Sequence, residues 1–419
     1  MDQNKLFNLA NNNVHQNEKI VVFGVGGGGG NALNHIIESG VQGVDFVAAN
    51  TDARALDMSQ APNKIILGEA LTRGLGAGAN PQVGANAAKE SSDKIKEYIT
   101  GADMLFVTAG MGGGTGTGAA PVIAELAKDM GVLVVGVVTK PFGFEMGKRM
   151  HTAEEGITQL KKNVDALLIV ENDRLLQMDN GVKIKIIDAY KKVDEVLRQA
   201  VQGVTDLITK NGFINLDFAD IKAILTNAGT AIMGMGEGEG EDRATKAAKN
   251  AITSPLMTFP VTGAKGILLN VTTGSEILLG EMSEAAKIIE ETADQDAQVI
   301  WGHVIDESLG DKVHVTLIAT FPEDGKERPK IITRTNTDDQ QKTQQPSRNP
   351  QQPPRTPVQP QQPPRINTLY DAFTKKRRAQ EGFEEARLTQ PANDEHSVFT
   401  GMQRKPYDQP AFFRKNLKD

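Results

Sequence analysis

A chain of 419 residues, 39% hydrophobic and 24% charged, is long enough for two globular domains and a tail. The absence of cysteine excludes disulfides, thiolate catalysis and cysteine-bound metal, and the six histidines are too scattered to predict a metal site. A net charge of -7 disfavours general nucleic-acid binding. With no signal-peptide core and no apolar run of the roughly 18 residues that span a membrane, we expect a cytoplasmic protein without direct membrane insertion.

After a polar arm, residues 1–18, the first predicted strand is Lys19–Phe23. It leads into the glycine-rich segment Gly24–Asn31 and then into a helix. Gly24, Gly26 and Gly29 also fit the G-x-G-x-x-G dinucleotide pattern, which leaves an NAD-dependent oxidoreductase as one alternative. That alternative needs an acidic residue at the end of the second strand, whereas Phe46–Ala49 ends on Asn50 and Thr51.

Further strands are predicted at residues 64–67, 104–108, 133–138 and 166–170, separated by helical patterns. This alternation predicts a parallel sheet with helices on both faces and ligand loops at the carboxyl ends of the strands. The loop Gly74–Pro81 lies near that edge. We expect it to close over a terminal phosphate, and a plain connector is the alternative.

The most informative segment is Gly110–Gly118, between the strand at residues 104–108 and a helix predicted to open at Ala119–Val122. Pro121 is expected in the first turn of that helix, where its missing N–H costs nothing. Glycine lets the backbone approach an anion closely, and the helix start adds a partial positive charge. Thr115 and Thr117 add hydroxyl donors, so the segment predicts a phosphate site.

Glu145 and Arg149 follow the strand at residues 133–138 and lie four residues apart. They form either a simple helix ion pair or contacts to the ribose and phosphate of a nucleotide. A Walker-type phosphate loop is absent, because no G-x-x-x-x-G-K-[ST] occurs and Lys148 is not followed by a hydroxyl residue.

Apolar residues at helical spacing predict a long helix over Ile186–Lys210 that stops at Asn211–Gly212. An acidic segment with Asp217 and Asp220 then begins another helix. The rest, up to about residue 335, is predicted to be an α+β unit. Its expected helices are residues 219–233, 241–253 and 283–293, and its expected strands are residues 266–271, 299–304 and 313–320.

Beyond residue 335 the composition changes to glutamine, proline and charge, so a disordered linker is expected. Its basic cluster, Lys375–Arg378, is interpreted as solvated charge. Aromatic residues return in Pro406–Lys415. Aromatic anchors beside an arginine are typical of a short motif that orders on a partner protein.

These motifs, in this order, resemble the FtsZ family, the bacterial relatives of tubulin. Gly112–Gly118 is similar to the tubulin signature loop, Gly24–Asn31 to the first nucleotide loop and Asn215–Asp220 to the catalytic loop. Pro410–Lys415 resembles the family's tail peptide, although Phe413 replaces the usual leucine, and Met146 between Glu145 and Gly147 is a second departure.

The resemblance implies a tubulin-like α/β fold with a parallel-sheet GTPase domain. The implied organisation is an N-terminal arm (1–18), a GTP-binding domain (19–185), a central helix (186–212), an α+β C-terminal domain (213–335), a linker (336–400) and a partner-binding peptide (401–419). It also implies site residues. Phosphate would be held by Gly27, Gly28, Gly29, Gly30, Asn31, Gly114, Thr115 and Gly116, the sugar–phosphate region by Glu145 and Arg149, the base by Tyr190 and Asp194, and catalysis would use Asn215, Asp217 and Asp220.

The implied function is a GTPase that polymerises head to tail, with GTP/GDP and Mg²⁺ held mainly through phosphates and water. It would act in a ring at the mid-cell division site beneath the inner membrane, and bind membrane-tethering and regulatory proteins through Pro406–Lys415. Two further hypotheses are a plasmid-segregating filament and a scaffold without turnover. The tail peptide disfavours the first of these, and the acids at residues 217 and 220 disfavour the second.

A geometric argument from helix length supports this implied function. If Asp194 contacts guanine, the sixteen residues of helix from there to Lys210 span roughly 24 Å. Asp217 then lies too far away to act on its own nucleotide, because acid–base catalysis requires hydrogen-bond distance or one bridging water. We therefore expect the two acids to act on the nucleotide of the next subunit. Contacts of this head-to-tail kind generate open filaments.

Overall fold

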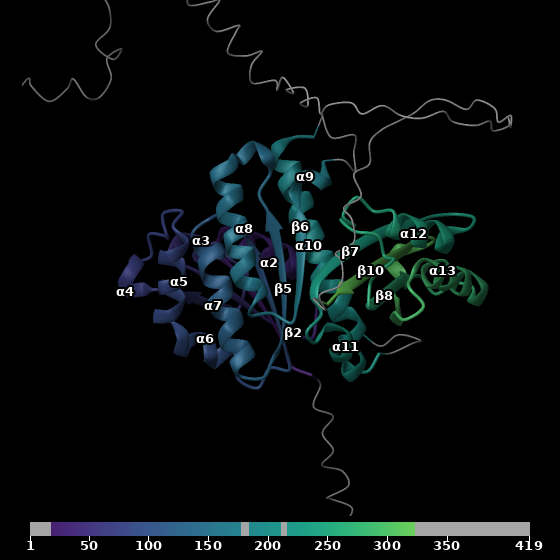
Figure 1. Cartoon of the computed structure of the whole chain (residues 1–419), viewed down its shortest axis with the longest axis horizontal. Helices are drawn as coiled ribbons and strands as arrows, with labels where there is room; N and C mark the ends of the chain where they lie inside the picture. Colours follow the sequence, from purple (N-terminus) through teal and green to yellow (C-terminus); the bar gives the residue numbers. More distant parts are fainter. Residues whose placement is uncertain (1–17, 177–183, 211–215, 323–419) are drawn as a thin grey trace, which may run out of the picture. The chain divides into compact units, whose positions relative to one another are not determined.

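The computed structural model describes residues 18–176, 184–210 and 216–322. In these residues the strands form one sheet of order β3-β2-β1-β4-β5-β6-β7-β10-β8-β9 (Figure 1). The strands are β1 (Ile20–Val25), β2 (Val44–Asn50), β3 (Asn63–Ile66), β4 (Met104–Gly110), β5 (Leu133–Lys140), β6 (Ala166–Glu171), β7 (Gly229–Gly238), β8 (Gly266–Thr273), β9 (Gln298–Ile305) and β10 (Val313–Phe321).

The helices alternate with the strands along the first half of the chain and then group with the later strands. They are α2 (Gly26–Glu38), α3 (Ala53–Asp57), α4 (Glu69–Thr72), α5 (Pro81–Glu90), α6 (Ser92–Ile99), α7 (Thr115–Asp129), α8 (Gly147–Lys161), α9 (Asn172–Leu175), α10 (Ile186–Thr209), α11 (Phe218–Leu225), α12 (Arg243–Ile252) and α13 (Leu279–Thr292). The predicted long helix is confirmed as α10.

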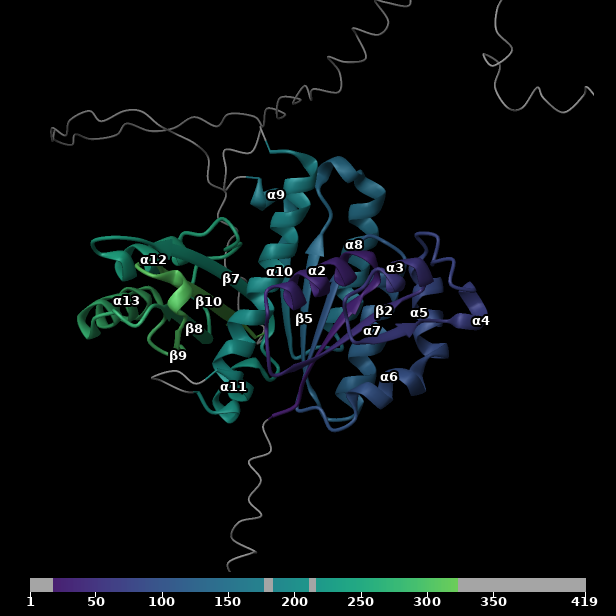
Figure 2. The ribbon, with the colours of Figure 1, turned by 180° about the vertical axis from the view of Figure 1, so that it is seen from behind.

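Strands β1 to β7 are parallel neighbours, and β10 pairs antiparallel with β7 and β8. Because β1 is buried on both faces, its side chains alternate between two cores. Ile20 and Val22 belong to the core that includes α2 and α10, whereas Val21 and Phe23 belong to the core of α5 to α8. Figure 2 shows the face that α2 covers. The predicted parallel sheet with helices on both faces is therefore confirmed.

The predicted helix over residues 219–233 is wrong. Helix α11 ends at Leu225, and residues 229–238 form β7. The turn between them contains Asn227 and Gly229, both at positive φ, which ends the helix. Gly236 and Gly238 of β7 face α12, where a Cβ atom would lie only 2.0 and 1.9 Å from helix carbonyl oxygens. Their spacing of two residues is the strand signal.

The predicted start of the helix after the glycine segment is also wrong. Helix α7 begins at Thr115, so Pro121 lies inside the helix rather than in its first turn. The second half of the segment Gly110–Gly118, which the sequence predicts to be a loop, is therefore helical. Proline has no N–H, so it cannot donate to the carbonyl of Thr117 four residues earlier.

The sheet is continuous between the two predicted domains, because β6 pairs with β7 through residues 166–168 and 229–231. The domain boundaries themselves stay predictions. Most of the arm, the linker and the tail peptide lie outside the described residues. Of the helices that the structure describes, none is long and apolar enough to cross a membrane.

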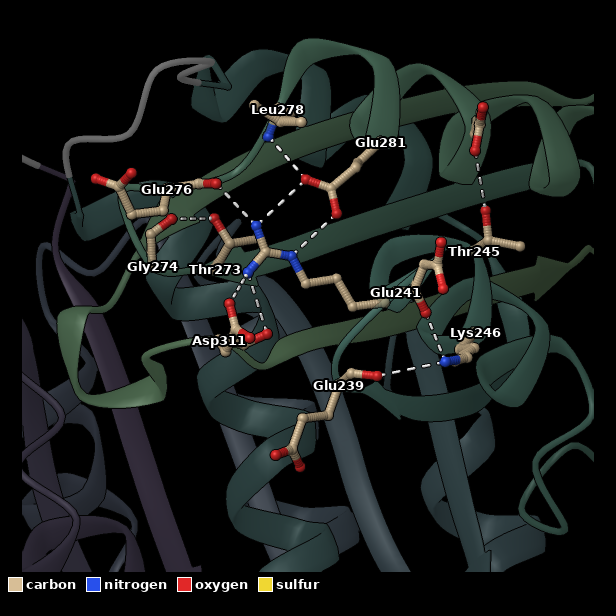
Figure 3. A network of polar contacts seen from close by, with 12 residues as sticks. Glu239, Glu241, Thr245, Lys246, Thr273, Gly274, Glu276, Leu278, Glu281 and Asp311 are labelled. Carbon is tan, nitrogen blue, oxygen red and sulfur yellow. Dashed lines mark hydrogen bonds and ion pairs between the residues drawn. The ribbon is translucent and has the colours of Figure 1, made fainter.

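Arg243 organises one end of the unit built on β7 to β10. Figure 3 labels three residues that accept hydrogen bonds from it, Glu276, Glu281 and Asp311. It is 8% exposed, and its guanidinium donates to both carboxylate oxygens of Glu281, at 3.0 and 3.2 Å. It also donates to the carbonyl of Glu276 at 2.8 Å and to the carboxylate of Asp311 at 2.6 Å. One buried arginine thus joins α12, the start of α13 and the segment before β10.

Candidate functional site

The strand order reverses direction at β1. Strands β2 and β3 follow on one side of β1, whereas β4, β5 and β6 follow on the other. In an open parallel sheet, the crevice beyond the carboxyl ends of the strands at such a switch point is the usual ligand site. The two glycine-rich segments leave from β1 and β4, which are paired up to Val25 and Ala109 at their carboxyl ends. Both segments therefore meet at this crevice.

Two helix N-termini, those of α2 and α7, converge there. Gly26 begins α2 at φ +72°, and a Cβ atom on it would lie 2.7 Å from the backbone nitrogen of Gly116. A Cβ atom on Gly28 would lie 3.1 Å from the Cα atom of Gly110. The close approach depends on these glycines, and it directs two helix dipoles and their free N–H groups toward one place.

Three glycines of these segments face open space. Cβ atoms built on Gly27, Gly30 and Gly113 meet nothing within 4 Å. Gly27, Gly28 and Asn31 are exposed, and Gly29 is buried against the carbonyl of Thr108. Glycines that face open space beside helix N-termini fit a phosphate group, because the backbone amides can reach its oxygens directly.

The segments after β2 and β3 complete this side of the crevice. The hydroxyls of Thr51 and Thr115 lie 2.6 Å apart. A Cβ atom on Gly114 would lie 2.8 Å from the nitrogen of Asn80. The loop Gly74–Pro81 therefore lies against the glycine segment, and its closure over a phosphate stays a prediction. Asp52 caps α3 by accepting from the N–H of Arg54, so it performs a structural task.

Thr117 does not supply a hydroxyl to the crevice, contrary to the sequence expectation. Its side chain is buried, and its hydroxyl accepts from the N–H of Gly112 at 2.9 Å. This bond closes the turn that precedes α7. Thr51, in contrast, was not among the predicted site residues. The signal that could have found it is its position directly after a buried strand at the same edge of the sheet.

Glu145 and Arg149 lie beside the crevice and pair with each other at 3.2 Å, so the simple ion-pair interpretation holds in this structure. Glu145 also accepts from the N–H of Phe142 at 2.9 Å. A Cβ atom on Gly112 would lie 2.7 Å from Cγ of Arg149, which brings this arginine onto the glycine segment. Met146 between the two has φ +77°, an unusual value for a side chain of its size.

Tyr190 lies at the start of α10 beside the Glu145 segment. Its ring meets the ring of Phe142 edge to face at 5.3 Å, and it remains 39% exposed. Burial and the neighbouring Glu145 carboxylate raise the pKa of Tyr190. One turn further along α10, burial raises the pKa of Asp194 to about 6, against an opposing effect of His35. The structure thus places an aromatic face and a carboxylate one helical turn apart.

Asp217 and Asp220 lie far from this crevice. Gly43, just before β2 begins, packs against Thr209 at the end of α10, so α10 ends at the amino edge of the sheet. Both views show α11 at the opposite end of the molecule from α9 (Figures 1 and 2). Asp217 caps α11 by accepting from the N–H of Ala219 at 3.2 Å, and both acids are exposed. Asn215 lies outside the described residues.

A parallel sheet, paired glycine loops at its switch point and a long helix that runs from there to the opposite edge define a nucleotide-binding protein of the tubulin class. Residues 19–180 match the GTPase domain of the Tubulin/FtsZ family, and residues 229–321 match the C-terminal domain of the FtsZ family. The chain belongs to this family. It is a guanine-nucleotide-binding GTPase of the polymerising, tubulin-like cytoskeleton.

Solved structures agree with this assignment. An empty FtsZ dimer from M. jannaschii is 42% identical, covers 76% of this chain and 92% of its own, and has a TM-score of 0.71. A point mutant of FtsZ from M. jannaschii is also 42% identical, with coverages of 77% and 96% and a TM-score of 0.72. A GTPγS-bound CetZ2 protofilament from Haloferax volcanii is 21% identical, with coverages of 73% and 94% and a TM-score of 0.60, and shows the fold alone.

Proposed function

We propose that GTP binds in the crevice at the switch point, with its phosphates on the N-termini of α2 and α7. Gly27 to Asn31 and Gly114 to Gly116 hold the phosphates through backbone amides, and Thr115 adds a hydroxyl. The open space at Gly27, Gly30 and Gly113 supports this assignment. Mg²⁺ would be held through phosphate oxygens and water, which suits a cation that keeps much of its hydration shell.

The base lies on α10 in this proposal. Tyr190 offers its exposed ring for stacking, and the ionised carboxylate of Asp194 accepts from the N1–H and 2-amino groups of guanine. Glu145 and Arg149 lie between the phosphates and the base. When GTP binds, Glu145 accepts from a ribose hydroxyl and Arg149 donates to a phosphate oxygen. These contacts replace part of the ion pair that the two side chains form with each other.

Hydrolysis requires a second subunit. The observation that carries this conclusion is that α11, which Asp217 caps and which contains Asp220, lies at the other end of α10 from the crevice. The 24 residues of α10 span about 36 Å, so neither acid can reach its own nucleotide. Placed over the nucleotide of the next subunit, with Asn215, they orient the attacking water. GTP hydrolysis then depends on head-to-tail assembly.

Apolar side chains around the base site suit such a contact. Four large hydrophobic side chains are exposed here, although exposure of apolar surface does not stabilise a monomer. They are Phe144, Met146, Ile186 and Ile187, at 58%, 77%, 66% and 69% exposure. Exposed apolar patches of this kind are typical of protein–protein contacts. A related chain, CetZ2, has been solved as a protofilament.

The cellular role that fits these features is the cytokinetic ring beneath the inner membrane at mid-cell. Filaments would recruit membrane-tethering and regulatory division proteins through Pro406–Lys415. Many weakly binding tails on one filament gain the avidity that a single peptide lacks.

The test is to add GTP, ATP or NAD to the full-length protein and to follow light scattering and phosphate release together. We expect scattering that rises only with GTP and decays as phosphate accumulates. Scattering with no phosphate release would favour a scaffold, and hydride chemistry with NAD would favour an oxidoreductase. Either result would contradict the proposed function.

A further inference from the structure

Thr51 directly follows β2, and its hydroxyl lies 2.6 Å from the hydroxyl of Thr115. Thr115 is the first residue of α7. Its Cβ atom lies 3.3 Å from a Cβ atom built on Gly26, the residue at which α2 begins. The side chain of Thr51 therefore reaches the place where the two helix N-termini converge.

The backbone of Thr51 is held by the loop Gly74–Pro81. The carbonyl of Thr51 accepts from the N–H of Gly76 at 2.9 Å, and the next residue, Asp52, forms a β-bridge with Leu75. Thr51 is 0% exposed, and the branched Cβ atom of threonine limits rotation of its side chain. The fold itself thus fixes the position of this hydroxyl.

A phosphate group beside Thr115 would decide which of the two hydroxyls donates to the other. A hydroxyl has one hydrogen to donate, and phosphate oxygens accept hydrogen bonds. If the Thr115 hydroxyl donates to a phosphate oxygen, it can only accept from Thr51. In the part of the chain that the structure describes, Thr115 is the one hydrogen-bond partner of the Thr51 hydroxyl. Residue 51 must then be a donor, which valine and alanine are not.

We propose that Thr51 is a positioning residue for phosphate binding: its hydroxyl donates to Thr115, and Thr115 donates to a phosphate oxygen. The bond from Thr51 holds the Thr115 hydroxyl in the orientation that serves the phosphate. A hydroxyl that accepts one hydrogen bond also donates another more strongly. This inference rests on the proposed function, because it needs a phosphate beside Thr115.

The experiment measures the dissociation constants of the full-length protein for fluorescent analogues of GDP and of non-hydrolysable GTP, both labelled on the ribose. Two comparisons isolate the hydroxyl at residue 51, namely the wild type with Thr51→Val, and Thr51→Ser with Thr51→Ala. The matched control is Thr320→Val on β10. It removes the hydroxyl of another buried threonine, which donates to the carbonyl of Gly266 at 3.1 Å.

We expect Thr51→Val to bind at least one of the two analogues about three- to ten-fold more weakly, the usual effect of one hydrogen bond. Thr51→Ser and the control Thr320→Val should bind as the wild type does, even where their melting temperatures fall. Circular dichroism melting shows whether each variant folds. If Thr51→Val does not fold, Thr51→Ala compared with Thr51→Ser decides. Unchanged affinity for both analogues in a folded variant without the hydroxyl overturns the proposal.

A double-mutant cycle tests whether Thr51 acts through Thr115. In a Thr115→Val background, the further change Thr51→Val should weaken binding by less than about two-fold, because the hydroxyl that Thr51 positions is already absent. A loss as large as in the wild-type background would overturn the positioning role.

Failure of the proposed function gives a different result. In that case Thr115→Val and Gly27→Ala both bind the two analogues as tightly as the wild type. Weaker binding by Thr115→Val, together with unchanged binding by Thr51→Val and Thr51→Ala, would overturn only the role of Thr51.

Discussion

Asp194 has to be ionised to bind guanine as proposed, whereas its burial favours the neutral carboxyl. Under the proposed function its carboxylate accepts from guanine, and burial raises its pKa to about 6, above the ordinary value of about 3.9. A carboxyl whose pKa is raised by folding destabilises the fold when it is ionised. The cost is absent below about pH 4, grows as the pH rises through the window from about 4 to 6, and is constant above it.

We therefore expect Asp194→Asn to increase the free energy of unfolding by about 1–2 kcal/mol at pH 7.5, after allowance for partial exposure, and by less at pH 5. Urea unfolding of the nucleotide-free protein at both pH values measures this. Asp45→Asn, at an exposed position on β2, should change little. Equal stability of Asp194→Asn and wild type at pH 7.5 would contradict the assignment of a destabilising charge.

Replacement by alanine is expected to have opposite effects on stability at two glycines, Gly118 and Gly27. A Cβ atom on Gly118 would lie 1.9 Å from the carbonyl oxygen of Pro81, so α5 and α7 cannot keep their contact. A Cβ atom on Gly27 meets nothing within 4 Å. The first glycine serves packing, and we propose that the second serves the ligand.

We expect Gly118→Ala to lower the free energy of unfolding by about 1–3 kcal/mol, as overpacking does. Gly27→Ala should keep or raise stability, since alanine favours a helix by up to about 1 kcal/mol, and should weaken GDP binding at least several-fold. Thermal melting and GDP titration separate the two effects. Unchanged GDP affinity in Gly27→Ala would remove Gly27 from the phosphate site.

At the scale of elements, Arg243 joins α12 to the start of α13 and to the segment before β10. Its contacts reach α13 through Glu281 and the segment before β10 through Asp311 (Figure 3). Glu281 also accepts from the N–H of Leu278, which fixes the first turn of α13. The pKa of Glu281 is lowered, above all by its hydrogen bond to Arg243.

Arg243→Met keeps much of the side-chain volume and removes the arginine that pairs with the half-buried Glu281. We expect it to destabilise the protein by about 3–5 kcal/mol, the usual cost of removing one partner of a buried ion pair. Lys94→Met is the matched control, because Lys94 forms an exposed pair with Glu69 and should cost less than about 1 kcal/mol. Similar melting temperatures for the two variants would show that the Arg243 network contributes little.

At the scale of the whole molecule, the crevice and the acids of α11 lie at opposite ends of α10 (Figure 1). Catalysis within one chain is therefore geometrically excluded under the proposed function. Assembly and hydrolysis become coupled because the complete site exists only between two copies.

We expect Asp217→Ala to bind GTP normally and to lose about 10²–10⁴-fold in turnover, the usual contribution of a positioned acid–base group. A mixture with Gly27→Ala, impaired only in nucleotide binding, should recover part of the activity at hybrid contacts. Phosphate release from the mixture and from each parent, with assembly verified by sedimentation, measures this. A mixture no more active than its parents would contradict catalysis between subunits.

The sequence determined the parallel sheet, the long helix and the pair of glycine segments, because periodicity and glycine spacing are local properties of the chain. It failed at residues 219–233, where helix α12 packs so closely on β7 that glycines replace larger residues. It also misplaced the start of α7 and the role of Thr117, since the helix begins inside the motif.

Only the tertiary structure decided which segments meet. Thr51 and Thr115 are 64 residues apart, and His35 and Glu195 are 160 apart. No local pattern encodes such contacts, because they follow from strand order and helix packing. The tertiary structure likewise places the crevice at one end of α10 and Asp217 and Asp220 beyond the other end. In the sequence these motifs are simply neighbours, and the length and direction of the helix between them separate them in space.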